Sequence, residues 1–356
     1  MARGQNKRPQ TKTKKRPTSS RSALRHAVRI VHHVCCVAGA HSLIEDTRSE
    51  GAPKALGSAI EQLDTPALYD WLITALSYQG ISNGAASAYL EKHGSVTWAE
   101  IEHHLSKLPP CPKLRSYWHF HQCGYFKSRG TCSQPEHFAS CPLPKHPLRN
   151  GRLNQSAYAL YLFIRDIADS DLVGWIDAQI RGAPDNATAM RESLLRPLRH
   201  VFGVADKVLS MSLSMILLSA QDERTHWHLT GGSMIAVDTL VHKWLHRTGI
   251  LTRCRAEHPY GQACYENDGC AGIIEKIAAR IDAREFNRAF PSYFPRYVQY
   301  AIWRFCAQDE LDICNSNRID DRKRCQDKWC RLFKNCDRRS VYLFMRLVPN
   351  VIESSR

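Results

Sequence analysis

The stretch Met234-Ile-Ala-Val-Asp238-Thr-Leu-Val-His-Lys-Trp244 places one carboxylate between an apolar run and an amphipathic segment. Beyond Asp238, the residues Val241, Trp244 and Leu245 recur at the spacing of one helix face. An aspartate in front of such a segment is a common N-cap, because its side chain accepts a hydrogen bond from the first backbone N–H groups. The stretch therefore predicts a helical segment over residues 234–247, in which Asp238 is the single acidic side chain.

A second informative stretch lies 31 positions earlier, counted from Lys207 to Asp238. Val201-Phe-Gly-Val-Ala-Asp-Lys207 puts Gly203 between two segments with helical spacing, which predicts a helix–turn–helix hairpin. The first N–H groups of the second helix have no partner within that helix, so a phosphate can bind there. Each stretch alone has an ordinary structural explanation, but such explanations do not account for the order in which the two follow one another.

The rest of the chain repeats the helical spacing, and the alternation typical of strands is nearly absent. This pattern predicts a mainly α fold. The helical spacing after Leu68 is interrupted around Gln79 and Gly80, and Ser95 is the expected cap of the next helix. The other expected helices, or helical stretches with a break, cover residues 22–44, 68–90, 96–105, 158–167, 173–180, 192–201, 205–219, 272–284 and 297–306.

The composition is that of a folded protein with an excess of positive charge. Of the 356 residues, 43% are hydrophobic and 23% charged, which suffices for a sizeable core. Lys and Arg number 49 against 34 Asp and Glu, a difference of 15 that is typical of proteins that bind polyanions, most often nucleic acid. The longest apolar stretch, residues 208–221, is too short to span a membrane. No secretory signal opens the chain, so we expect a cytoplasmic, nucleoid-associated protein without membrane contact.

The first 22 residues are rich in Lys, Arg, Pro, Thr and Ser and contain almost no apolar side chains. This composition predicts a disordered basic arm over residues 1–22. Ten positive residues precede the first acid, Glu45. We expect the arm to contact phosphates without regard to sequence, and a solubilising tail is the alternative interpretation.

The chain has 14 cysteines and no secretory signal, which favours metal or cluster ligation over disulfides. The strongest group has four thiols on a C-terminal loop rich in Lys and Arg. Four soft ligands on a short loop suit a cubane iron–sulfur cluster or tetrahedral zinc. The group consists of Cys314, Cys325, Cys330 and Cys336.

A second group lies in a looped, Pro- and Gly-rich insertion and consists of Cys111, Cys123, Cys132 and Cys141. Zinc is the first interpretation of this group, with His137 able to replace one thiolate, and a second iron–sulfur cluster is the alternative. A third set has only three cysteines, Cys254, Cys264 and Cys270. Its fourth ligand could be His258 or Cys306, and ordinary free thiols are an equally good interpretation.

Four features in chain order resemble the helix-hairpin-helix (HhH-GPD) DNA glycosylases, and the endonuclease III branch in particular. They are the helix ending Leu76-Ser-Tyr-Gln79, the hairpin Phe202-Gly-Val-Ala-Asp-Lys207, the segment Ile235-Ala-Val-Asp238-Thr and the C-terminal cysteine loop. Members of this branch carry a Leu-x-Ser-x-Gln segment, a Leu-Pro-Gly-Val-Gly-x-Lys hairpin, an Ala-Val-Asp-Thr segment and a terminal [4Fe–4S] loop. The resemblance covers residues 68–95 and 192–336. It leaves the arm and the 111–141 insertion unmatched.

The resemblance implies a role for each matching residue. Asp238 would stabilise the cationic sugar as the base departs, or activate a nucleophile. Lys207 would form a Schiff base with the sugar in a member that also cuts at abasic sites. Gln79 would fill the gap left by the flipped nucleotide, while Gly203 and Ala205 would present backbone amides to a phosphate near it.

The C-terminal thiols at positions 314, 325, 330 and 336 would hold a [4Fe–4S] cluster. The hairpin departs from the family pattern at Ala205, which replaces its second glycine, and at Asp206, whose negative charge would favour the protonated amine of Lys207.

These features divide the chain into six expected segments. They are the arm (1–22), N-terminal helices with the first part of the helical domain (23–107), the Cys/His-rich insertion (108–150), the domain with the hairpin and the catalytic segment (151–305), the cluster loop (306–340) and a tail (341–356).

The expected function is that of a monomeric DNA glycosylase, which flips and excises a damaged or modified base from double-stranded DNA, with AP-lyase activity through Lys207. The alternative is a non-catalytic iron–sulfur or zinc DNA-binding protein on the same scaffold. In that protein Asp238 would be only an N-cap and Lys207 only a phosphate contact. RNA binding through the insertion and the arm is a third interpretation.

Overall fold

The computed structural model describes residues 20–39, 52–78, 83–145, 151–204 and 206–342. Within these ranges the chain is helical and has no strand, apart from an isolated antiparallel bridge between Phe126 and Thr131. The predicted mainly α class is confirmed. Among the described residues, no helix is both long and apolar enough to cross a membrane.

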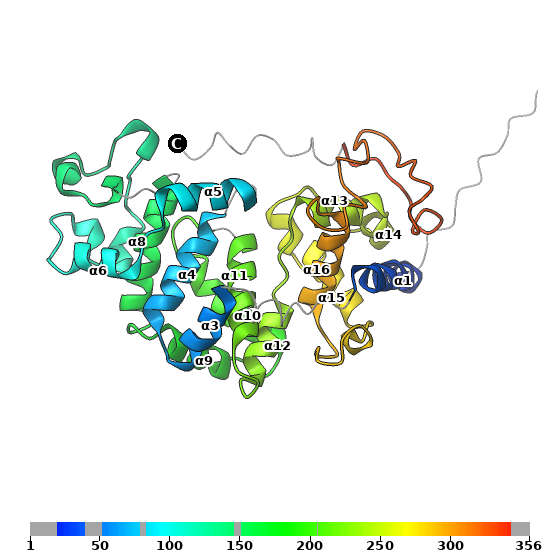
Figure 1. Ribbon diagram of the computed structural model, residues 1–356, viewed down its shortest axis with the longest axis horizontal. Coiled ribbons are helices and arrows are strands. Elements are labelled where there is room, and N and C mark those ends of the chain that lie inside the picture. Colours follow the sequence, from blue (N-terminus) through cyan, green and yellow to red (C-terminus); the bar gives the residue numbers. More distant parts are fainter. Residues whose placement is uncertain (1–19, 40–51, 79–82, 146–150, 205, 343–356) are drawn as a thin grey trace, which may run out of the picture.

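The helices form two lobes that lie side by side in Figure 1. The first lobe contains the helices from α3 to α12, and all of them except α5 contribute to one continuous apolar core. They are α3 (Ala52–Glu61), α4 (Thr65–Ser77), α5 (Asn83–His93), α6 (Trp98–Leu105), α7 (Tyr117–Phe120), α8 (Gly151–Asp166), α9 (Leu172–Gly182), α10 (Ala187–Leu198), α11 (Asp206–Ser219) and α12 (Thr225–Ser233). The cysteine-rich insertion adds the short 3-10 turns η1 (Pro112–Leu114), η2 (Lys127–Arg129), η3 (Pro135–Ser140) and η4 (Leu143–Lys145).

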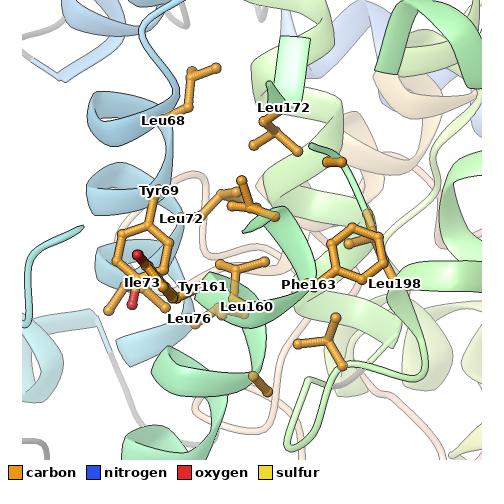
Figure 2. Packing of buried hydrophobic residues seen from close by; sticks show 14 of the residues in the cluster. Leu68, Tyr69, Leu72, Ile73, Leu76, Leu160, Tyr161, Phe163, Leu172 and Leu198 are labelled. Carbon is orange, nitrogen blue, oxygen red and sulfur yellow. The ribbon is translucent and has the colours of Figure 1, made fainter. Parts of the chain in front are cut away.

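The core of the first lobe lies where α4 meets α8 (Figure 2). Leu72 on α4 and Leu160 on α8 point into the same apolar interior. The hydroxyl of the buried Tyr69 donates a hydrogen bond to the carbonyl oxygen of Ala157 at 2.8 Å, so its one polar atom is satisfied. This core is a rigid support for the hairpin between α10 and α11.

The second lobe combines the N-terminal helix α1 (Ser20–Ala38) with helices from the last third of the chain. These are α13 (Thr239–Arg247), α14 (Ile250–Cys254), α15 (Cys270–Ala278) and α16 (Pro295–Cys306), with the 3-10 turns η5 (Gln262–Tyr265) and η6 (Ala283–Glu285). The guanidinium of Arg304 on α16 donates to the carbonyl oxygen of Ala38 at 2.5 Å, and this bond ties the end of α1 to the lobe.

Two expected helix starts are wrong in position. Helix α6 is capped by Thr97 rather than by Ser95, because Thr97 and Glu100 form a capping box in which Glu100 Oε2 accepts from the Thr97 N–H at 2.8 Å. The segment expected to be helical from residue 234 begins its helix only at Thr239, because Asp238 caps α13 in an extended conformation.

Helix α12 occupies a stretch for which the sequence predicts no helix. Its two glycines allow close packing, one within the first lobe and one against the second. A Cβ atom at Gly231 would meet the side chain of Leu217 at 2.8 Å, and one at Gly232 would meet the ring of Phe294 on the second lobe at 3.2 Å. Helix α12 therefore contacts both lobes directly before the linker that leads to Asp238.

Candidate active site and metal centres

The predicted hairpin joins α10 to α11 at the edge of the first lobe. Gly203 has a φ of +81°, a left-handed conformation that a residue with a Cβ adopts only at a cost. The Val204 N–H donates to the carbonyl oxygen of Val201 at 3.3 Å and closes the turn. Lys207 follows in the first turn of α11 and is half-buried. Ala205 lies outside the described residues, and so does Gln79.

Asp238 caps helix α13 from the second lobe. Its Oδ1 accepts a hydrogen bond from the Val241 N–H at 2.9 Å. Burial raises the pKa of Asp238 above its ordinary value, while the Val241 N–H and the positive charge of Lys207 act in the opposite direction. The side chain is thus a partly desolvated carboxylate within electrostatic reach of Lys207.

A pocket of about 410 Å³ lies between the two lobes beside these residues. The first lobe contributes Lys207 to its lining, and the second lobe contributes Tyr260, Tyr265 and Val237, the neighbour of Asp238. The Tyr265 hydroxyl accepts from the Val237 N–H at 3.1 Å and so fixes the strand-like linker against the pocket wall. Burial, followed by the charge of Asp238, raises the pKa of Tyr260 to about 12, so this hydroxyl stays protonated at neutral pH.

Asp206 does not pair with its neighbour Lys207. Its carboxylate accepts from the Arg199 guanidinium at 3.0 Å, and Arg199 also binds Glu192 at 2.8 Å. The negative charge at position 206 is therefore directed toward Arg199, which lines the same pocket. The expected effect of Asp206 on the amine of Lys207 stays a prediction, and the salt bridge adds Arg199 as a direct partner of this carboxylate.

A buried cation lies behind the linker. Arg296 on α16 is 7% exposed and donates to Gln299, whose Oε1 also accepts from the Ala236 N–H at 3.4 Å. Burial lowers the pKa of Arg296 to about 10, while Tyr265, Tyr300 and Asp238 raise it. The sequence analysis missed Arg296, since an arginine in an amphipathic helix is ordinarily read as a surface residue.

The C-terminal loop brings its four predicted cysteines to one cavity. The walls include the apolar side chains of Phe305, Ile313 and Leu332. The cavity-lining thiols are those of Cys314, Cys325, Cys330 and Cys336. Burial raises the pKa of Cys330 and of Cys336 above the usual value for a thiol.

Two cations line the same cavity with unsatisfied donors. Arg247 is 2% exposed and pairs with Asp321, yet its Nη1 has no hydrogen-bond partner. The Nε of Arg338 also lacks one. A buried donor without a partner is costly, so the cavity is suited to an anionic group that would accept these hydrogen bonds.

The loop is tied to helices α13 and α14. Asp321 binds Lys243 at 2.8 Å as well as Arg247, and Asp337 binds Arg253 at 2.5 Å. The cations on the outside of the loop are all exposed. They are Arg322, Lys323, Arg324, Lys328, Arg331 and Lys334.

The four cysteines of the 108–150 insertion also lie near one another, since the pKa of Cys141 responds to the charges of Cys111, Cys123 and Cys132. Three of the four sulfurs accept a hydrogen bond from the N–H two residues later. The donors are Tyr125 to Cys123, Gln134 to Cys132 (3.3 Å) and Leu143 to Cys141. The same arrangement occurs in the C-terminal loop, where Leu332 donates to Cys330 and Arg338 to Cys336 (3.3 Å). Such bonds favour thiolates.

Within the described ranges, one group of His and Cys side chains has all its ligand atoms within 4.8 Å of one another, and it consists of His242, His258, Cys264 and Cys270. This group could bind a metal. Hydrogen bonds with Cys270, His242 and His258 hold the pKa of the Cys264 thiol well below its usual value. Of the two alternatives for the fourth ligand, His258 belongs to the group and Cys306 does not; Cys254, the third cysteine of the predicted set, also lies outside it. His242 was not predicted as a ligand. The signal that could have found it is its position four residues before His246, which places the two histidines on one helix face.

Comparison with known proteins adds no relative. No protein-family model, no curated protein and no solved structure matches the chain. What this chain does has to be inferred from the geometry of the pocket and of the cysteine groups.

Proposed function

We propose that the protein is a DNA glycosylase of the helix-hairpin-helix type, which excises a damaged or modified base from duplex DNA. The observation that carries the proposal is the charge interaction between Lys207, which lines the pocket between the lobes, and Asp238, which directly follows the lining residue Val237. These two positions are the ones that the resemblance assigns to chemistry. Helical proteins often join helices by glycine turns, so the turn alone would not support the proposal.

A glycosylase must flip its target base, which costs a few kcal/mol, and must then stabilise positive charge on the sugar. The pocket volume of about 410 Å³ lies within the range of small-molecule sites and accommodates a nucleobase. Tyr260 and Tyr265 offer aromatic faces against which a flipped base can stack.

Asp238 would act on the sugar. As the bond between C1′ and the base breaks, the carboxylate stabilises the positive charge that develops on the ring, or takes a proton from an attacking water. Its raised pKa makes it a stronger base than an exposed aspartate. If Lys207 attacks C1′ instead, its nitrogen forms the new bond, the base departs, and Asp238 accepts the proton that the amine loses.

The cavity of the C-terminal loop suits a [4Fe–4S] cluster. Four cysteinyl thiolates around a cubane carry net negative charge, which the unsatisfied donors of Arg247 and Arg338 would offset. Tetrahedral zinc would draw its sulfurs to about 3.8 Å of one another, given Zn–S bonds of about 2.3 Å. No three cysteines of this loop, all of which are described, lie within 4.8 Å of one another. Bound there, the cluster would fold the loop and present its exposed cations.

The insertion at 108–150 supports the same preference for a cluster. Its described thiols likewise include no set of three within 4.8 Å, although zinc was the first interpretation of the group. A second iron–sulfur cluster therefore fits this group better than zinc does. Its exposed Trp118 and Phe126, which are 57% and 50% exposed, would face the nucleic acid beside it.

Double-stranded DNA is the proposed partner. The exposed cations of the C-terminal loop lie on the lobe that carries Asp238, and the overall charge of +15 favours a polyanion. We propose that the protein acts as a monomer in the cytoplasm, on nucleoid DNA.

The proposal is tested with protein purified without oxygen and duplexes that each carry one modified base. Hot alkali converts abasic sites to strand breaks, so cleavage after alkali reports excision. We expect cleavage of at least one duplex, and we expect the Asp238→Asn variant to lose it while binding the same duplex. Binding of duplex DNA without alkali-revealed cleavage of any duplex in the panel would support the non-catalytic alternative instead.

A further inference from the structure

We propose that His242, His258, Cys264 and Cys270 bind one Zn²⁺, and that this ion fixes the wall of the pocket against helix α13. The group lies outside the two four-cysteine sites and contains Cys264, Cys270 and His258 of the third predicted set, together with His242. Its metal content and its effect on the wall do not depend on the proposed glycosylase activity.

The distances are those of a tetrahedral site. The Nδ1 of His242 lies 3.3 Å from the sulfur of Cys270 and 3.4 Å from that of Cys264, and the Nε2 of His258 lies 3.3 Å from Cys270. Zinc bonds of about 2.3 Å to sulfur and about 2.0–2.1 Å to nitrogen give a sulfur–nitrogen edge of about 3.5 Å in a tetrahedron. The four ligand atoms therefore need to move little to close around an ion.

The surroundings favour a closed structural site. Cys264 and Cys270 are fully buried, and His242 is 1% exposed with hydrogen bonds only to the two sulfurs. The other ring nitrogen of His258 hydrogen-bonds the carbonyl oxygen of Ala256 at 2.7 Å, which is the usual outer contact of a zinc-bound histidine. Two thiolates and two neutral imidazoles around Zn²⁺ carry no net charge, so such a site can be buried at little cost.

The ligands come from both sides of the pocket wall. His242 lies one turn after Asp238 on α13, while His258 and Cys264 flank the wall residues Tyr260, Gly261 and Gln262. The 3-10 turn η5 is the only regular structure in this described part of the wall. Gly261 and Gln262 are exposed. An ion held by all four ligands would join this loop to the helix that carries the carboxylate.

The first test measures zinc per chain in the wild type and in three variants. Cys264→Ser and Cys270→Ser should each contain one zinc fewer than the wild type. The matched control, Cys254→Ser, changes a nearby half-buried cysteine outside the group and should keep the full content. Equal zinc in all four proteins, or loss of iron rather than zinc, would overturn the assignment.

A second measurement covers the case in which the serine variants do not fold. Wild-type protein produced with Co²⁺ in place of zinc should show the visible absorption of tetrahedral cobalt with thiolate ligands, and added Zn²⁺ should abolish it. Absence of that absorption in folded, cobalt-loaded wild type would contradict a site with two nitrogen and two sulfur ligands.

Hydrogen exchange tests the role in the wall. In Cys264→Ser, amides of residues 258–269 should exchange at least tenfold faster, while those of helix α8 keep the wild-type rate. In Cys254→Ser both regions should match the wild type. Loss of zinc with unchanged exchange over residues 258–269 would refute the role in the wall.

Discussion

Asp238 is expected to make the folded protein less stable at neutral pH than an asparagine in the same place would. The side chain has two opposing effects on stability. Its hydrogen bond to the Val241 N–H caps α13, and replacing such a cap by alanine costs about 1 kcal/mol. Its negative charge is partly buried, and burial raises its pKa. Asparagine retains the cap and removes the charge, whereas alanine removes both.

The sign of the pH dependence follows from the direction of the pKa shift. A carboxyl group with a higher pKa in the folded than in the unfolded state binds its proton more tightly when folded. The stability of the wild type therefore falls as the pH rises from the ordinary pKa of aspartate through the raised value. Above the raised pKa the full cost is present, so Asp238→Asn should there be at least as stable as the wild type, and the gap should shrink as the pH is lowered toward the ordinary pKa of aspartate.

The difference between the asparagine and alanine variants isolates the cap, because both lack the charge. About 1 kcal/mol corresponds to a melting temperature about 2–4 °C lower for Asp238→Ala than for Asp238→Asn in a domain of 150–250 residues. Thermal unfolding of the three proteins between pH 5 and pH 8 measures both effects. An asparagine variant that is less stable than the wild type, with a gap that grows as the pH rises, would refute the reasoning. It would mean that the fold favours the ionised carboxylate.

Three further predictions concern other parts of the site. Lys207→Ala should abolish the strand cleavage that occurs without alkali, but base excision should remain detectable as strand cleavage after alkali treatment of the same duplex. Equal loss of both kinds of cleavage would mean that Lys207 acts in DNA binding. Arg247→Met should lower the iron content and destabilise the protein by about 3 kcal/mol, because it leaves Asp321 and the cluster cavity short of a buried cation; the half-exposed control Arg253→Met should cost about 1 kcal/mol or less. The double variant Lys328→Ala with Arg331→Ala should lower the slope of log affinity against log salt by about 1–2, because each phosphate contact contributes about 0.9. An unchanged slope in a titration with duplex DNA would show that these exposed cations do not face the backbone.

Much of the helical pattern could be predicted from the sequence, because apolar spacing reports which face of a helix is buried. The C-terminal thiols could be grouped for a different reason. They are close in the chain, so a short loop brings them together. The hairpin turn could also be predicted, because Gly203 stands between two segments with helical spacing.

The rest depends on contacts between distant parts of the chain. Helix α1 lies with the C-terminal lobe, and nothing in its own amphipathic pattern identifies that partner. Helix α12 was not predicted, because the close approach of Leu217 and Phe294 to its two glycines exists only in the folded state. The candidate metal group could be predicted in part: Cys264, Cys270 and His258 lie close in the sequence, whereas His242 lies 16 positions before His258 and joins them only through the fold.

The most direct test of the proposed activity is release of a free base. Single-turnover incubation of wild type and Asp238→Asn with the same modified duplex, followed by mass spectrometry of the small molecules released, measures the reaction itself. We predict that the wild type releases the modified base and that the variant, equally folded and equally bound to DNA, releases it at least 10²-fold more slowly, in line with the effect of removing one electrostatic contact to a transition state, about 10²–10³. Release at the same rate by both proteins would contradict the assignment of Asp238 and of the pocket.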